Sequence, residues 1–248
     1  MIRPWPNRDQ IEQDLLLARM IIAIYEHPLL KLELAFRGGT CLHQVHLSSP
    51  LRYSEDLDFV RTTHTPIGPV LDALRDVARD VGLTVAQVAL GMHPKVKLRA
   101  PATSGGVDLR IKVEINTHET SPARPLIELP FAVSSNWFTG ACSLLTFTAA
   151  ELMSTKLRAL YQRSKGRDVF DLWLALDQLG LDPGEIIACF GPYRPLGYTS
   201  TLAVANLQSK LKNPDFVEDL SLLVANPPAN YDIALAAARI EVELLIKV

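Results

Sequence analysis

The feature that most constrains the fold is residues 107–116, in which apolar and polar side chains alternate without exception. One set comprises Val107, Leu109, Ile111, Val113 and Ile115, and the other comprises Asp108, Arg110, Lys112, Glu114 and Asn116. Successive side chains of a strand point to opposite faces of a sheet. The pattern therefore predicts a strand with one apolar face and one wholly polar face.

Shorter apolar runs predict a mixed arrangement of strands and helices around this strand. Strands are expected over residues 32–36, 57–60, 84–90 and 95–100, and helices over residues 9–30, 40–47 and 66–82. The Pro-rich segment 121–130 is expected to form a loop.

The hydrophobic period changes from strand-like to helical after Thr146. Thr148 and Glu151 have the spacing of a capping box, and helices are expected over residues 149–164, 167–179, 183–190, 198–211, 216–225 and 231–246. We place a domain boundary near residue 145, between a mixed domain at 1–145 and a helical domain at 146–248. The fold class expected is α+β.

Charge and cysteine content limit the classes of protein. Twenty-five Lys and Arg against 27 Asp and Glu give a net charge of −2, so any contact with nucleic acid needs a local basic patch. Three cysteines without metal-site spacing suit a reducing cytosol. The longest apolar run, 15–25, falls short of the ~20 residues that span a bilayer. With no secretory signal at the start, we expect a soluble cytoplasmic protein without a membrane partner.

The first candidate site is Gly38-Gly39-Thr40, which closes a predicted strand and opens a predicted helix. Glycines allow a phosphate to approach the backbone, and the free N–H groups of a helix start favour an anion. An ordinary strand-to-helix turn is the alternative explanation.

The second candidate is the segment that contains Ser54, Asp56 and Asp58, which share one face if the segment is extended. The Cα atoms of the two aspartates would be ~6.6 Å apart, so their carboxylates can converge on one site. Like charges this close need a cation, and oxygen ligands suit Mg²⁺. Two solvated carboxylates are the alternative.

Glu114 lies on the polar face of the alternating strand, beside Lys112 and Asn116. A third carboxylate from a parallel or adjacent strand would complete a metal site of the kind used in nucleotidyl transfer. The alternative is a solvated sheet face. The same alternative applies to Lys95, Lys97 and Arg99, a stripe that could also meet a nucleic-acid backbone.

Lys156 lies beside apolar residues of its predicted helix, at the edge of the buried face. The ordinary explanation is a lysine that extends its ammonium into water. Asp168 and Asp171 lie three residues apart on the next helix, where acidic residues complement the helix dipole.

These residues together resemble a known family. The runs FRGGTCL (36–42) and LRYSEDLDF (51–59) resemble the GG[ST]…DxD signature of the polymerase-β nucleotidyltransferase superfamily. In the form GGTxL…RxSxDLDF they are similar to the AbiEii/AbiGii toxin family. Glu151, KLRAL (156–160) and RDVFDL (167–172) resemble that family's downstream motif. Fifteen residues separate Thr40 from Asp56, which fits the family's inserted loop.

The resemblance implies a bacterial toxin that transfers a nucleotide from an NTP with Mg²⁺ or Mn²⁺, often paired with an antitoxin. Some relatives resemble tRNA 3′-end modifiers. By motif position, the resemblance places nucleotide binding on Gly38, Gly39, Thr40, Ser54, Lys156 and Asp168, and catalysis or metal binding on Asp56, Asp58, Lys156 and Asp171. Either Asp168 or Asp171 is the downstream acid. Glu114 is added to the expected metal ligands only because strand alternation places it on the polar face.

We therefore expect a nucleotidyltransferase core followed by a helical domain, with the active site in the cleft between them. The rival interpretation is a non-catalytic interaction protein that has a nucleotidyltransferase-like fold and binds only an NTP or an antitoxin. The intact pair of aspartates argues against this rival.

Overall fold

The computed structural model describes residue 5 and residues 7–106, 108–224 and 226–248. Two compact units are present. The first is formed by the chain up to Thr120 together with Leu126–Phe147, and the second by Ser121–Pro125 together with Thr148–Val248.

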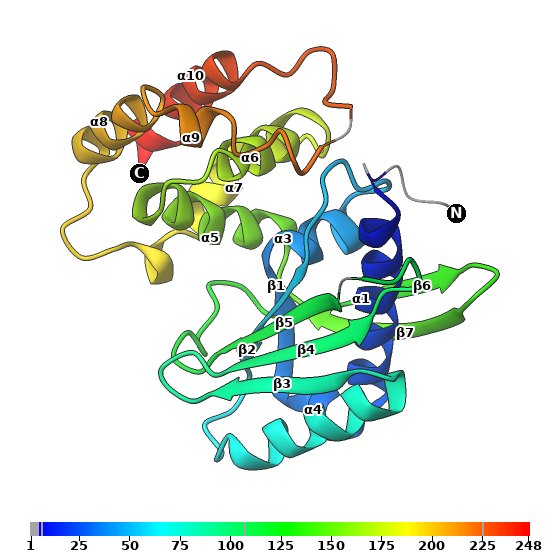
Figure 1. The fold of residues 1–248 in the computed structure, drawn as a ribbon. Helices are drawn as coiled ribbons and strands as arrows, with labels where there is room; N and C mark the ends of the chain where they lie inside the picture. The colour runs from blue at the N-terminus through cyan, green and yellow to red at the C-terminus, as the bar shows by residue number, and fades with distance from the viewer. Residues whose placement is uncertain (1–4, 6, 107, 225) are drawn as a thin grey trace. The chain divides into compact units, whose positions relative to one another are not determined.

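A mixed sheet of seven strands dominates the first unit, in the order β3-β4-β5-β2-β1-β7-β6 (Figure 1). Its strands are β1 (Leu34–Arg37), β2 (Asp56–Arg61), β3 (Thr84–Ala89), β4 (Lys95–Pro101), β5 (Asp108–Asn116), β6 (Ile127–Ser134) and β7 (Thr139–Thr146). The pairs β2–β5 and β1–β7 are parallel, and the remaining neighbours are antiparallel. The alternating segment is thus an interior strand, as its buried apolar face requires. Val107, its predicted first residue, lies outside the described residues.

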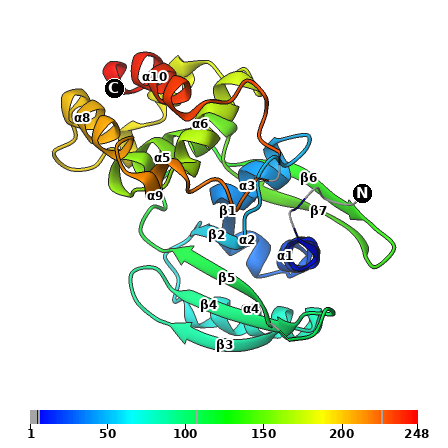
Figure 2. The same cartoon turned by 45° about the horizontal axis from the view of Figure 1, so that its top comes forward.

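Helices α1 (Arg8–Glu26) and α4 (Gly68–Val81) pack together on one side of the sheet (Figures 1 and 2). They cover the apolar side chains of β5, of which Ile111 and Val113 are at most 1% exposed. Burial of this kind stabilises by about 25 cal/mol per Å² of apolar surface removed from water. The polar side chains of β5 point to the other face, which is therefore available for chemistry.

Three elements of the first unit differ from the sequence expectation. One is β7, a strand that the sequence analysis did not predict. Leu32 and Glu33 belong to a short helix, α2 (Leu30–Glu33), so the strand predicted over 32–36 begins at Leu34. The predicted loop 121–130 is wrong for its last four residues, which form the start of β6. Pro130 hid this strand, but β6 is a sheet edge, where a residue without an N–H group is tolerated.

The short helix predicted over 40–47 is present as α3 (Gly38–Cys41), which continues into a wider π-helical turn, Leu42–His46. Such turns occur frequently at functional sites. The helix follows β1 directly, so its first residue, Gly38, lies at the carboxyl end of that strand.

The second unit is helical. Its α-helices are α5 (Ala149–Gln162), α6 (Arg167–Asp177), α7 (Pro183–Ala188), α8 (Ser200–Lys210), α9 (Pro214–Val217) and α10 (Ile233–Glu243), with 3₁₀ turns at Gly191–Tyr193 and Leu245–Lys247. The helix predicted over 216–225 is wrong: α9 ends at Val217, turns follow, and residue 225 lies outside the described residues. None of the helices described in either unit is long and apolar enough to cross a membrane.

Glu151 has a different role from the one its capping-box spacing predicts. Thr148 does cap α5, because its hydroxyl accepts the N–H of Glu151 at 3.3 Å. The buried carboxylate of Glu151 instead accepts the N–H groups of Ala123 (2.5 Å) and Arg124 (3.0 Å) and the hydroxyl of Tyr193 (2.6 Å). Glu151 therefore holds the Pro-rich segment 121–125 within the second unit.

Candidate active site

Three predicted carboxylates lie together on the polar face of the first unit's sheet. In the parallel pair β2–β5, Asp58 is directly opposite Glu114, and Asp56 is directly opposite Lys112. Asp56 and Asp58 are two residues apart on β2 and so share a face. The strand register therefore places the third carboxylate beside the second, on the neighbouring parallel strand.

Cations flank these carboxylates along the same row of the sheet. Arg37 on β1 is opposite Asp58, and Lys95 on β4 is opposite Glu114. The Nζ atom of Lys95 lies 3.3 Å from Glu114 Oε2, and Arg37 forms a 2.6 Å ion pair with Glu119. The row thus reads as a cation, two carboxylates and a cation across four strands.

Lys112 bridges two of the carboxylates. Its Nζ atom lies 2.8 Å from Asp56 Oδ2 and 3.5 Å from Glu114 Oε2. Burial alone would lower the pKa of Lys112, but the hydrogen bond and charge of Asp56, helped by Glu114, outweigh burial and raise it. A positive charge is therefore favoured between these two side chains.

The carboxylate of Asp58 would be stabilised by a nearby cation. Burial, the main cause, and the nearby charge of Asp56 raise its pKa, whereas Arg37 opposes the shift. A raised pKa means that the ionised form is less stable here than in water. A cation bound at this face would offset that cost.

The Gly-Gly-Thr turn packs against these carboxylates. Gly38 has φ +86°, a conformation that L side chains rarely adopt, and a Cβ atom on it would collide with the carboxylate of Asp58. A Cβ atom on Gly39 would collide with the guanidinium of Arg52 and lie 3.1 Å from Ser54 Oγ. Gly38 is thus favoured both by close approach and by its backbone conformation, whereas a side chain at position 39 would require Arg52 to move.

The hydroxyls of Thr40 and Ser54 form hydrogen bonds inside the protein. Thr40 is 1% exposed, and its Oγ1 atom lies 2.9 Å from Ser54 Oγ and donates to the backbone carbonyl of Asp56. Thr40 therefore fastens the turn to the start of β2 and fixes the position of Asp56.

The sequence did not single out Arg37, Lys112, His43 or Arg52 as site residues. The Nδ1 atom of buried His43 accepts the N–H groups of Leu51 (3.3 Å) and Arg52 (3.4 Å), which shapes the segment before β2. The alternation of apolar and polar residues along β5 did place Lys112 on the same face as Glu114. The contact of Lys112 with Asp56, however, depends on the pairing of β2 with β5, which local sequence does not encode.

Lys156, Asp168 and Asp171 form a buried ion cluster in the second unit. The Nζ atom of Lys156 lies 2.7 Å from Asp171 Oδ2 and 3.3 Å from Asp168 Oδ1, and both aspartates are 0% exposed. Two nitrogens of Arg163 each lie 2.7 Å from an oxygen of Asp168. Burial alone would raise the pKa of Asp168, but Lys156 and Arg163 outweigh it and lower the pKa.

This cluster corrects the ordinary explanations of its members. Lys156 is 6% exposed and lies inside the unit, not at the edge of a buried face with its ammonium in water. Asp168 and Asp171 neutralise a buried lysine, which is a stronger constraint than the helix dipole. Sequence spacing could not show this, because the cluster depends on how α5 packs on α6.

The carboxylates of the first unit have the chemistry of a magnesium site. Oxygen ligands from Asp56, Asp58 and Glu114 suit a hard divalent cation, and Lys112 already shows where positive charge is favoured. Within the described residues, no three His, Cys, Asp or Glu side chains are gathered as a ready metal cluster. A metal would therefore compete with Lys112 for the oxygens of Asp56 and Glu114.

Acidic side chains on a sheet beside a glycine turn are typical of proteins that catalyse phosphoryl or nucleotidyl transfer. The family model described as nucleotidyl transferase AbiEii toxin, type IV toxin–antitoxin system, matches residues 21–237. The chain belongs to this family and is an enzyme of the nucleotidyltransferase class. A comparison with curated proteins finds no significant match.

Solved structures share the fold. The nucleotidyltransferase toxin MenT4 from Mycobacterium tuberculosis superposes with a TM-score of 0.62 at 17% identity, covering 96% of this chain and 84% of that one. JHP933 from Helicobacter pylori gives a TM-score of 0.57 at 17% identity, covering 97% and 93%. These likenesses confirm the expected fold class: a mixed sheet with helices, followed by a helical region.

Proposed function

We propose that the chain is a Mg²⁺-dependent toxin that transfers a nucleotide from an NTP to the 3′ end of a tRNA. One observation carries the proposal: the parallel register of β2 and β5 sets Glu114 directly beside Asp58, with Asp56 two residues away. Membership of a toxin–antitoxin family implies an antitoxin partner and an NTP substrate. NTPs and tRNA are both cytoplasmic, so we place the activity there.

In the proposed reaction, a hydroxyl oxygen of the acceptor forms a bond to the α-phosphorus of the NTP. The bond from the α-phosphorus to the bridging oxygen breaks, and pyrophosphate leaves. The proton of the hydroxyl passes to the carboxylate of Glu114, which lies at the surface of the sheet beside Asp58. Little covalent chemistry is needed, so positioning and charge neutralisation determine the rate.

Asp56, Asp58 and Glu114 would hold the divalent cation. When bound, this cation neutralises charge on the phosphate oxygens and orients the NTP. Gly38 and Gly39 keep the turn close to Asp58, while Thr40 and Ser54 fix the start of β2. Lys112 holds Asp56 and Glu114 in place until the cation binds.

From motif position we further propose that Lys156 assists NTP binding and that Asp168 and Asp171 orient its ammonium. The two buried aspartates hold the ammonium between them, so its position is fixed before any ligand binds. Since Asp171 makes the shorter contact with the Lys156 ammonium, 2.7 Å against 3.3 Å for Asp168, we assign Asp171 as the downstream acid.

The test is to incubate the protein with each NTP, Mg²⁺ and intact or 3′-trimmed tRNA, and then to sequence the RNA 3′ ends. The proposal expects one or more added nucleotides that depend on Mg²⁺ and on Asp58. A protein that turns over NTP but leaves every tRNA 3′ end unchanged would overturn the choice of acceptor. Coexpression with an adjacent small gene should relieve growth arrest if that gene encodes the antitoxin.

A further inference from the structure

A second charged surface lies on the same polar face of the sheet, over β4 and β5. It is a hollow of about 390 Å³ that adjoins the carboxylates, because Asp56 and Lys112 are among its lining residues. The remaining charged residues that line it are Glu55, Lys97, Arg99, Asp108 and Arg110. We call Lys97, Arg99, Arg110 and Lys112 the basic face.

The register of β4 and β5 places like charges directly opposite one another. Lys97 is paired with Lys112, and Arg99 is paired with Arg110, in two successive same-face positions. Like charges directly opposite in an antiparallel pair are destabilising. The sheet therefore carries a local electrostatic cost that an anion bound at this face would relieve.

Internal ion pairs compensate only part of this charge. Lys112 is paired with Asp56 and Glu114, and Arg99 lies 3.8 Å from Asp108. Within the described residues, Lys97 and Arg110 take part in no ion pair, and both are exposed. Two adjacent, solvated cations thus remain on a chain whose net charge is −2, so the basic face is a local feature.

From this geometry we infer that the basic face binds the phosphate backbone of a nucleic-acid acceptor and guides its end to Asp56 and Asp58. The inference rests on the proposed function, since it assigns a surface to the acceptor of that reaction. Phosphate contacts by Lys and Arg fix the position of a nucleic acid without reading its sequence. A continuous strip of cations that ends at carboxylates suits a chain of phosphates that ends at a reacting hydroxyl.

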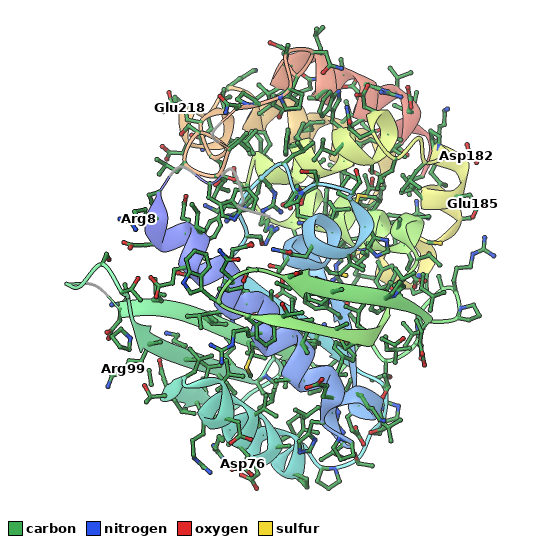
Figure 3. The ribbon with its side chains drawn as sticks, turned by 90° about the vertical axis from the view of Figure 1, so that its right-hand side faces the viewer. Arg8, Asp76, Arg99, Asp182, Glu185 and Glu218 are labelled. Atoms are coloured by element: carbon green, nitrogen blue, oxygen red, sulfur yellow. The ribbon has the colours of Figure 1, made fainter. Side chains whose placement is uncertain are left out.

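The occupant is a nucleic acid because the cations are repeated along the strands. Lys97 and Arg99 are two residues apart on β4, as are Arg110 and Lys112 on β5, which spaces the cations by ~7 Å along the sheet. A single triphosphate beside Asp58 would not extend along this row to Arg99. Figure 3 labels Arg99 on β4 and Asp76 on helix α4, the helix that carries the control residues used below.

The test compares two double variants of the full-length protein. Lys97→Gln/Arg110→Gln removes the two unpaired cations, neither of which contacts a carboxylate of the proposed active site. Arg75→Gln/Arg79→Gln is the control, since it removes two cations from α4: Arg75 is half-buried, Arg79 is exposed, and they pair with Asp72 and Asp76. Fluorescence anisotropy with labelled tRNA, without NTP, measures the affinity over a range of salt concentrations.

The inference predicts that Lys97→Gln/Arg110→Gln binds tRNA roughly tenfold or more weakly near 0.1 M salt. It also predicts that the slope of log K against log salt falls by about 1 to 2. The variant should melt at or above the wild-type temperature, because the like-charge pairs are relieved, and should keep its affinity for Mg²⁺-NTP.

If the two double variants bind tRNA equally well, the basic face is not the acceptor site. This outcome is separable from failure of the proposed function, because binding is measured without transfer. Wild-type protein that binds tRNA through Lys97 and Arg110 but never modifies it would overturn the reaction and leave the surface assignment intact.

Discussion

The backbone of Gly38 lies so close to the carboxylate of Asp58 that even a methyl group on this glycine would collide with it. The first glycine of the turn and the second aspartate of β2 thus form one structural unit, although nineteen residues separate them in the sequence. The contact links the conformation of the turn to the position of the Asp58 carboxylate.

Gly38→Ala should therefore lower both stability and transfer rate. Gly82→Ala is the matched control, because Gly82 has nearly the same φ (+90°) but a Cβ atom added to it would meet no atom within 4 Å. The backbone cost alone is about 1–2 kcal/mol. Chemical denaturation should show a larger loss for Gly38→Ala, and NTP turnover should fall in that variant alone. Equal effects of the two substitutions would refute the Gly38–Asp58 contact.

The raised pKa of Asp58 predicts a pH-dependent gain in stability for Asp58→Asn in metal-free protein. Below about pH 4, the pKa of an ordinary aspartate, the carboxyl is protonated in both states, so the two proteins should differ little. As pH rises toward the higher folded-state pKa, the wild type becomes less stable relative to Asp58→Asn. The reason is that its native state holds the proton on Asp58 more tightly than the unfolded chain does.

The measurement is the free energy of unfolding against pH, in the presence of a chelator, for both proteins. The difference between Asp58→Asn and wild type should increase from low pH to neutral pH. Saturating Mg²⁺-NTP should then raise the wild-type melting temperature, because the ligand binds only the native state. A difference that is constant over the whole pH range would contradict the pKa shift.

Much of this site was predictable because it depends on local patterns. Alternation over β5 placed Glu114 and Lys112 on one polar face, and the spacing of Asp56 and Asp58 placed both on one face of β2. Each of these statements requires only the two-residue period of a strand. Motif positions then predicted the family, which the match over residues 21–237 confirms.

What the sequence could not supply was pairing between distant elements. The contacts of Lys112 with Asp56, and of Lys156 with Asp171, depend on which strand or helix packs beside which. The start of β6 was hidden for a different reason: Pro130 and its neighbours look like a loop unless the strand is known to be a sheet edge. Glu151 likewise follows a capping pattern, but its carboxylate binds N–H groups from a distant segment.

Lys112→Gln should strengthen metal binding, because Lys112 now holds the oxygens that a divalent cation needs. We expect Mn²⁺ to bind about tenfold more tightly, which corresponds to ~1.4 kcal/mol. Electron paramagnetic resonance of free Mn²⁺ measures this affinity directly. Lys97→Gln is the control, since it removes a neighbouring lysine that makes no ion pair with Asp56 or Glu114. Weaker binding in Lys112→Gln would show that this lysine positions the ligands and does not compete with the metal.

Lys156→Met should destabilise the second unit by about 3–5 kcal/mol, because it leaves the buried charges of Asp168 and Asp171 undercompensated. Arg163→Met is the control: its side chain is half exposed and contacts the same Asp168, so its loss should cost less. Adding Asp171→Asn to Lys156→Met should restore part of the stability. If Lys156→Met has the same denaturant midpoint of unfolding as the wild type, the assignment of a buried ion cluster is wrong. The NTP affinity of folded Lys156→Met, measured at denaturant concentrations below its unfolding transition, tests the proposed role of Lys156 in NTP binding.

The most direct test of the account is the rate of nucleotide transfer from α-labelled NTP to tRNA by carboxylate variants on one sheet face. Asp56→Asn, Asp58→Asn and Glu114→Gln alter the three proposed active-site carboxylates. Asp80→Asn is the control, because Asp80 is an exposed carboxylate near the end of α4 and belongs neither to the proposed active site nor to the basic face. We predict that the first three variants fold and lose about 10²-fold or more of the rate, whereas Asp80→Asn keeps it. Near-wild-type transfer by folded Asp56→Asn and Asp58→Asn would contradict the assignment of this face as the active site.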